Sequence, residues 1–368
     1  MTVPRAQPIG SLLRPDAVKR AREDAAAGAI TPAELKRAED AAVDAALAAQ
    51  AAAGLDVATD GEMRRGHFTG ALSEAVDGLT EVPAAAQDWY GRHPEDRLRY
   101  THGRAVTGRL RRRRSLAQEE WVYARAAARG LGVALKQTLP SPLMMQTYWS
   151  PDLSTDAYAD PFDMFADAAA LLRDEVRDLV ALGCPYVQID APELALLVDP
   201  AVRESFVARG IDPDRMLTEG VELIASVVDV PGAAYGLHLC RGNREGHWLA
   251  TGGYAEIASA VFRRAGAFGT FLLEYDDARS GGFEPLADVP DDTAVVLGLV
   301  STKRPGLEDE DELLARIDDA SRHHPRDLLA LSPQCGFAST LAGNPLTPED
   351  QAAKLALVGR VARRAWPA

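Results

Sequence analysis

The feature that most constrains the fold is a repeated alternation of short apolar runs with longer helical stretches. Each apolar run ends in a polar or glycine-containing cluster, and a stretch rich in Ala, Leu, Glu and Arg follows it. The eight predicted strands are 7–13, 54–60, 133–139, 185–190, 233–240, 269–276, 294–301 and 327–335. Strands that alternate with helices in this way form a parallel sheet covered by helices.

Helix starts support this alternation. A capping residue followed by proline marks the first turn of the predicted helices 34–53, 161–183 and 349–366. Eight parallel strands that are each followed by a helix close into a barrel, and near-continuous apolar strands suit a sheet buried on both faces. We therefore expect an α/β fold, a single (β/α)8 TIM barrel. A doubly wound open sheet is the alternative.

One interval, 63–130, breaks the alternation between the second and third predicted strands. It carries a polar stretch that suits neither a core strand nor a core helix. The pattern at 106–110 predicts a small surface hairpin, and a helix at 115–130 leads back to the barrel. We expect one catalytic domain over 1–368 with an insertion at 66–114.

Charge and cysteine content exclude several classes of protein. The chain has 40 Lys and Arg against 54 Asp and Glu, and this net charge of -14 disfavours nucleic acid and anionic lipid as partners. Cys184, Cys240 and Cys335 are too few and too widely spaced for a disulfide framework. The start lacks an apolar signal core, and no apolar run approaches the roughly 20 residues that cross a bilayer. We expect a cytoplasmic protein with no membrane span.

Metal-binding residue types gather at the predicted strand ends. His238 and Cys240 are two positions apart at the end of one strand, so their side chains point to the same face. Glu274 lies in an apolar run, where an unpaired carboxylate is costly, and Cys335 ends the last strand. One nitrogen, two sulfurs and one oxygen suit tetrahedral zinc.

Acidic residues follow two other strands. Asp60 and Glu62 come after the second predicted strand, and Asp190 and Glu193 after the fourth. Carboxylates at the catalytic end of a barrel hold an ammonium group or a metal, or move protons. Ser11, at the end of the first strand, offers a hydroxyl and a backbone amide to a substrate carboxylate.

In this order, the strand-end motifs resemble the catalytic barrel of cobalamin-independent methionine synthase, and most closely the short members with a single barrel. The HxC pattern with a downstream Glu and Cys is the specific part. The matching segments are IGSLLRP, GLDVATDGEMRR, YVQIDAPE, GLHLCRGN, FLLEYDD, LGLVSTK and LALSPQCGF.

The resemblance implies roles for these residues. The zinc ligands would be His238, Cys240, Glu274 and Cys335. Ser11, Glu62 and Asp190 match positions where the family holds the backbone of homocysteine, and Glu62 and Asp190 are our candidate catalytic acids. The aromatic pair Tyr148-Trp149 falls near the family's pterin-stacking tryptophan, and Trp149 is the candidate for binding substrate. Arg64, near the expected mouth, and Lys303 are further candidates for binding substrate.

One position departs from the family. Full-length members have a histidine at the end of the seventh strand that helps to protonate the departing folate nitrogen, and this chain has Lys303 there. A lysine with a pKa of about 10.4 is a weak proton donor at neutral pH, so we expect poor turnover with unmodified methyltetrahydrofolate. Related short barrels activate other thiols with zinc, including one that opens epoxides with coenzyme M.

These observations favour a zinc-dependent transfer of a methyl group to a thiol. The expected acceptor is homocysteine, which gives methionine, and the expected donor is a methylated folate. Alkyl transfer to another thiol or from another donor is the first alternative, and a zinc hydrolase or lyase is the second. A barrel that binds zinc only structurally is the third. Two thiolates and a carboxylate neutralise the zinc charge, which keeps a bound thiolate nucleophilic and argues against hydrolysis.

Overall fold

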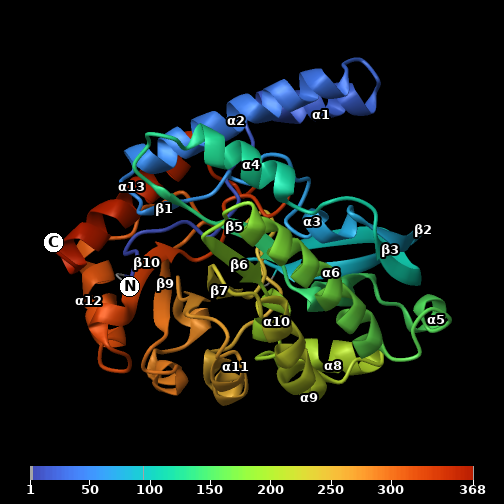
Figure 1. The fold of residues 1–368 in the computed structure, drawn as a ribbon. Helices are drawn as coiled ribbons and strands as arrows, with labels where there is room; N and C mark the ends of the chain where they lie inside the picture. Colours follow the sequence, from blue (N-terminus) through green and yellow to red (C-terminus); the bar gives the residue numbers. More distant parts are fainter. Residues whose placement is uncertain (1–2, 94, 368) are drawn as a thin grey trace.

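A parallel sheet of six strands forms the centre of the molecule (Figure 1). The computed structural model describes residues 3–93 and 95–367. The strand order β10-β9-β8-β7-β6-β5 follows the sequence without a reversal. A doubly wound sheet needs a point where the order reverses, so that alternative is not supported. The strands are β5 (Gln137–Pro140), β6 (Tyr186–Asp190), β7 (Ala234–Leu239), β8 (Thr270–Glu274), β9 (Ala294–Val300) and β10 (Leu329–Pro333).

Helices surround this sheet (Figure 1). Thr31 and Thr347 each form a capping box with the acidic side chain three residues later, which fixes where α2 and α13 begin. The helices are α1 (Asp16–Ala26), α2 (Pro32–Ala52), α3 (Gly70–Ser73), α4 (Gln118–Ala127), α5 (Pro151–Ser154), α6 (Pro161–Ala181), α7 (Pro192–Leu196), α8 (Pro200–Ala208), α9 (Pro213–Arg215), α10 (Val221–Val227), α11 (Ala258–Arg264), α12 (Glu310–Ala320) and α13 (Pro348–Ala365).

Short 3-10 or π turns complete the secondary structure: η1 (Pro142–Tyr148), η2 (Met216–Gly220), η3 (Tyr254–Glu256), η4 (Ala278–Ser280), η5 (Glu284–Asp288) and η6 (Arg326–Leu328). The core lies between the sheet and these helices. Every residue of β9 is buried, as expected for a parallel strand covered on both faces. None of the described helices is long and apolar enough to span a bilayer.

The predicted parallel α/β architecture is confirmed, but the strand pairing of the described residues does not form one closed sheet of eight. The second and third predicted strands are reduced to a separate pair, β1 (Val57–Ala58) with β4 (Ala134–Leu135), and β5 continues the third. The first predicted strand, 7–13, is not a strand. Next to this segment, the described residues form a single isolated parallel bridge, between Ala6 and Leu331.

The insertion contains a long antiparallel hairpin of β2 (Val76–Tyr90) and β3 (Arg97–Arg112). It is much longer than the small surface hairpin that the sequence predicts at 106–110. Figure 1 shows it extending to one side of the sheet, on the side of α3. Tyr90 pairs through its backbone with Trp248, which ties the hairpin to the loop after β7. The helix expected at 115–130 is α4.

Candidate active site

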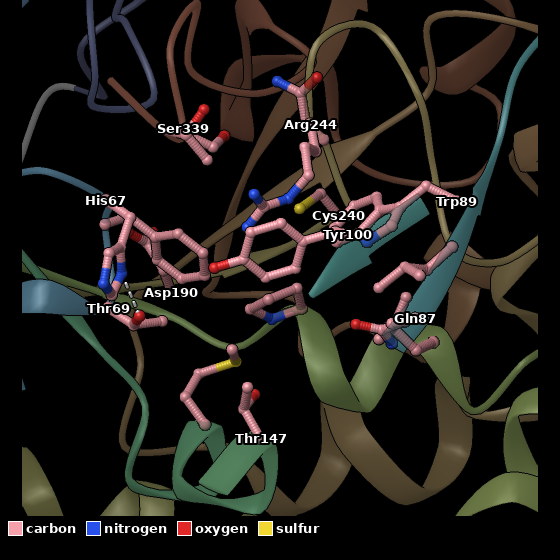
Figure 2. Close-up of a pocket in the computed structure, with 18 of the residues that line it drawn as sticks. His67, Thr69, Gln87, Trp89, Tyr100, Thr147, Asp190, Cys240, Arg244 and Ser339 are labelled. Carbon is pink, nitrogen blue, oxygen red and sulfur yellow. Dashed lines mark hydrogen bonds between the residues drawn. The ribbon is translucent and has the colours of Figure 1, made fainter. Parts of the chain in front are cut away.

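A cavity of about 640 Å³ opens at the carboxyl ends of the parallel strands (Figure 2). Its inner wall includes Ser11, Glu62, Asp190, Cys240 and Cys335. The hairpin supplies another part of the wall. Because catalytic groups of parallel α/β enzymes lie at this end of the strands, the cavity is the candidate active site.

Three buried side chains form a group that could hold a metal ion. One ligand atom each from His238, Cys240 and Cys335 lies within 4.8 Å of the others. His238 lies on β7 and Cys240 just beyond it, and the alternation of the strand directs both to one side. Cys335 follows β10, and its Sγ is 3.8 Å from that of Cys240.

The chemistry of these atoms fits a metal such as zinc. His238 Nδ1 lies 3.0 Å from the carbonyl oxygen of Leu272, so Nδ1 carries the proton and Nε2 keeps a free lone pair. That Nε2 is buried and has no hydrogen-bond partner among the described residues. The contact between the two thiols lowers the pKa of Cys335 and raises that of Cys240, and His238 lowers the pKa of Cys335 further. An imidazole lone pair and an easily ionised thiol are ligands that zinc prefers.

Glu274 does not belong to this group in the described structure. Its Oε1 accepts hydrogen bonds from Arg279 Nη2 at 2.8 Å and from Lys303 Nζ at 3.0 Å, and its Oε2 accepts one from the backbone N–H of Arg241 at 2.6 Å. Burial alone would raise the pKa of Glu274, but Lys303, Arg279 and Arg241 together lower it well below its usual value. Lys303 is itself buried and does not line the cavity. It is a fixed counter-ion of Glu274.

Glu62 presents one oxygen of its carboxylate without a partner. The turn after β1 holds Glu62 in the left-handed region with φ of 55°, and its backbone N–H donates to Asp60 Oδ1 at 2.8 Å. Thr138 donates to Glu62 Oε1 at 2.8 Å, while Oε2 is buried with no partner in the described part of the chain. A Cβ on Gly10 would lie 2.7 Å from Oε1, so only glycine fits beside this carboxylate.

Asp190 and Ser11 lie on the same inner wall. Gln188 Nε2 donates to Asp190 Oδ1 at 2.6 Å. Burial raises the pKa of Asp190 to about 7, although His238 opposes this effect. The inner wall therefore brings together two carboxylates, a hydroxyl and the three-residue group.

Other sequence-predicted residues lie elsewhere. Trp149 Nε1 donates to the carbonyl oxygen of Arg209 at 2.9 Å, and its neighbour Tyr148 lines the cavity instead. Arg64 forms an ion pair with Asp40 and lines a second cavity of about 510 Å³. Glu193 is fully buried, accepts a hydrogen bond from Ser141, and has a pKa that burial raises to about 8.

The sequence analysis missed the aromatic and cationic side of the cavity. Trp89, Tyr100 and Arg104 come from the hairpin, Arg209 from the C-terminal end of α8, and Arg244 from the loop after β7. The alternation along β2 and β3 could have indicated which residues share a face. Which face meets the cavity depends on the docking of the hairpin, and no local pattern reports that.

Comparisons with known proteins identify the family. Residues 3–347 match the family model described as cobalamin-independent synthase, catalytic domain. An uncharacterized protein of Bacillus subtilis, YxjG, is 36% identical over 368 residues, which cover 98% of this chain and 94% of that protein. A 5-methyltetrahydropteroyltriglutamate–homocysteine methyltransferase of Herpetosiphon aurantiacus is 26% identical over 336 residues, which cover 89% of this chain and 39% of that enzyme.

Solved structures agree with this result. A provisionally assigned vitamin-B12-independent methionine synthase from Listeria monocytogenes has a TM-score of 0.74 and 27% identity, with 100% of both chains covered. A B12-independent methionine synthase from Shewanella sp. W3-18-1 has the same fold, with a TM-score of 0.75 at 18% identity over 98% of this chain and 97% of that chain. The chain thus belongs to the family of the cobalamin-independent methionine synthase catalytic domain.

Proposed function

We propose that this protein is a zinc-dependent methyltransferase that transfers a methyl group to the thiol of homocysteine and so forms methionine. The observation that carries the proposal is the position of the buried group His238, Cys240 and Cys335, which lines the same cavity as Glu62 and Asp190. Membership of the family supports methyl transfer as the reaction class.

His238, Cys240 and Cys335 would hold the zinc. Glu274, the fourth ligand expected from the sequence, can join them only after it leaves Arg279 and Lys303. Zinc bound at this position would lower the pKa of a substrate thiol, so that the thiol is present as the more nucleophilic thiolate.

Other residues orient the acceptor. Glu62 Oε2 has no partner among the described residues, and Asp190 lies on the same wall, so together they can bind the ammonium group of an amino acid. The hydroxyl of Ser11 can donate to the carboxylate. With the backbone of homocysteine held in this way, its sulfur would be free to reach the two cysteines on the same wall.

The reaction balances as a displacement. The acceptor thiol loses its proton, the sulfur forms a bond to the methyl carbon, and the bond between that carbon and the donor breaks. The electron pair of that bond stays with the donor, which takes up a proton. Because Lys303 is held by Glu274 and Asp276, it is a poor candidate for supplying this proton.

We also propose that 1–368 is a single (β/α)8 barrel domain with the insertion at 66–114. Backbone hydrogen bonds support this reading at the gap between β10 and β1. Gln7 donates to Leu331 at 3.2 Å, and Asp56 donates to Ala6 at 2.8 Å. Through these contacts the segment around residues 6 and 7 lies between β10 and the start of β1, where a closed barrel would have its first strand.

The experiment is a measurement of zinc and of product on the purified protein. We expect about one zinc per chain and methionine formation from homocysteine with a methylated folate or another methyl donor. Coenzyme M in place of homocysteine, and an epoxide in place of the methyl donor, test the alternative thiol alkylations. Absence of zinc, or zinc without consumption of any thiol, would contradict the proposal.

A further inference from the structure

Glu62, the expected partner of the ammonium group, lies next to a buried arginine. Arg65 places its Nη1 3.6 Å from Glu62 Oε1, and the two side chains are 3% and 2% exposed. The hydroxyl of Thr138 joins them, because it accepts a hydrogen bond from Arg65 Nη1 at 3.1 Å and donates one to Glu62 Oε1 at 2.8 Å. A buried arginine at this distance attracts the carboxylate and would leave a neutral pair. A neutral pair is a weak partner for an ammonium group.

A second carboxylate holds the other side of this guanidinium. Glu120 Oε2 accepts hydrogen bonds from Arg65 Nη2 at 2.6 Å and from Nε at 3.1 Å, and Oε1 also lies 3.1 Å from Nε. Arg65 Nη2 donates in addition to the carbonyl oxygen of Thr138 at 2.8 Å. Nε and Nη2 are thus engaged by Glu120 and the backbone, and Nη1 is the nitrogen that faces Glu62. This fork is the geometry in which arginine binds a carboxylate most strongly.

The packing of α4 sets the position of Glu120. The residue lies in the first turn of this helix, where the backbone N–H groups at the helix start favour a carboxylate. Trp121 is buried, and its Nε1 donates to the carbonyl oxygen of Leu182 at 3.2 Å. The backbone N–H of Ala117 donates to Glu175 Oε1 at 2.7 Å, which fixes the start of the helix. Glu120 is therefore held by a helix that does not line the active-site cavity.

The charges around Glu62 leave one negative charge in excess. Arg65 is shared between the carboxylates of Glu62 and Glu120, so these three side chains together carry one negative charge. Two further charged residues contact the backbone of Glu62 and cancel each other: Asp60 accepts from its N–H at 2.8 Å, and Arg14 donates to its carbonyl oxygen at 2.7 Å. Burial raises the pKa of Asp60 to about 6, so most of this carboxyl is still ionised at neutral pH. Without Glu120 the charges would sum to zero.

We propose that Glu120 is a positioning residue of the acceptor site: it holds Arg65, and so leaves Glu62 the negative charge that binds the ammonium group of the amino acid. Arg65 and Glu120 line the second cavity and not the active-site cavity, so they act on the acceptor only through Glu62. The helix α4 thereby controls the affinity for the acceptor without contacting it. This inference rests on the proposed function, in which the acceptor is an amino acid.

The test measures methionine binding by calorimetry on the zinc-loaded full-length protein. In Glu120→Gln the side chain keeps its size but loses its charge, so Arg65 pairs with Glu62. The dissociation constant of methionine should rise about tenfold, the order expected when one buried charge near an ion pair is lost. The hydroxy analogue of methionine has a hydroxyl in place of the ammonium group, and its dissociation constant should change less than about threefold. A purely structural disturbance would weaken both ligands alike.

Glu119→Gln is the matched control. Glu119 precedes Glu120 on α4 and also lines the second cavity, but it is 69% exposed and forms its ion pair with Lys36 at 3.6 Å. Loss of this charge should change methionine binding less than about twofold, because solvent screens it. The double variant Arg65→Met with Glu120→Gln removes both buried charges and leaves Glu62 without a neutralising partner, so methionine affinity should return to within about threefold of the wild type. Metal analysis and urea unfolding show whether each variant holds zinc and is folded.

Unchanged methionine binding in folded, zinc-loaded Glu120→Gln, or an equal loss of both ligands, would overturn the inference. A folded double variant that binds methionine no better than Glu120→Gln would do the same. If the double variant does not fold, the comparison of the two ligands in Glu120→Gln decides. If the wild type itself does not bind methionine, the proposed function fails and the inference fails with it, whereas normal binding in both the wild type and Glu120→Gln refutes the inference alone.

Discussion

The inner wall of the cavity and the wall supplied by the hairpin are built in different ways. The inner wall takes Asp190 and His238 from paired parallel strands, and Cys240 and Cys335 from the residues just after β7 and β10. Another wall takes Trp89, Tyr100 and Arg104 from a two-stranded hairpin. A backbone bridge to the loop after β7 and ion pairs of Arg109 and Arg112 with acids of α6 join this hairpin to the rest of the molecule. The three-residue group and the two carboxylates thus lie on segments next to the parallel sheet, whereas the insertion adds a separate aromatic and cationic wall to the same cavity.

The strongest test of this difference between the two walls removes a thiol from the inner wall. In Cys240→Ser or Cys335→Ser, bound zinc should fall from about one per chain to less than about a tenth, because soft thiolates supply much of the affinity. Metal analysis after dialysis measures this loss. Cys184→Ser is the control, since Cys184 is buried away from the group, and should keep its zinc. Full retention of zinc in both inner variants would refute the ligand assignment.

The next test concerns a buried acid at the carboxyl end of β6. Burial raises the pKa of Glu193 from 4.5 to about 8, so the folded protein binds more protons than the unfolded chain between these values. The contribution of Glu193 to stability is therefore lost as pH rises through this window. Glu193→Gln should gain roughly 2–4 kcal/mol relative to the wild type between pH 5 and 8. Urea unfolding at several pH values measures this gain, and a pH-independent difference would contradict it.

A third test separates acceptor binding from metal binding. Glu62→Gln and Asp190→Asn should weaken methionine about 10- to 30-fold, because each removes a charged partner of the ammonium group. Both variants should keep their zinc. Calorimetry with methionine and metal analysis on the same samples check this expectation. Loss of zinc in either variant would place that acid next to the metal instead.

The smallest effect is expected at the hairpin tip. Asp96→Asn removes the charge that faces His247, in a contact where Asp96 is 48% exposed, so its effect on stability should stay below about 1 kcal/mol. Hydrogen exchange in 76–112 should become faster while the melting temperature is unchanged. Asp88→Asn, an exposed position of the same hairpin, should leave the exchange as it is. Equal exchange in all three proteins would mean that the contact between Asp96 and His247 does not help to hold the hairpin.

Much of the fold was accessible from the sequence because the central strands are continuous apolar runs. The predicted 233–240, 269–276 and 294–301 contain β7, β8 and β9. The prediction of a strand at 7–13 was wrong. Pro8 lacks an N–H and cannot donate to a ladder, so the pairing there is limited to single backbone contacts.

The site was predictable only where it depends on local spacing. His238 and Cys240 share a face because strands alternate, and Cys335 joins them because parallel strand ends meet. Arg279, one partner of Glu274, follows it by five residues, but Lys303 and Arg241 come from the ends of other strands. The spacing of residues in the chain does not reveal such a convergence. The proposed ligand role of Glu274 stays a prediction.

The backbone bridge between Tyr90 and Trp248 has a consequence for the order of folding. During synthesis the hairpin leaves the ribosome early, and its strands can pair at once because they are neighbours in sequence. The loop to which the hairpin binds carries Arg244 and Trp248, and it is synthesised much later, after β5, β6 and β7. Closing the bridge must therefore wait until the loop after β7 has been synthesised, and it is a long-range step.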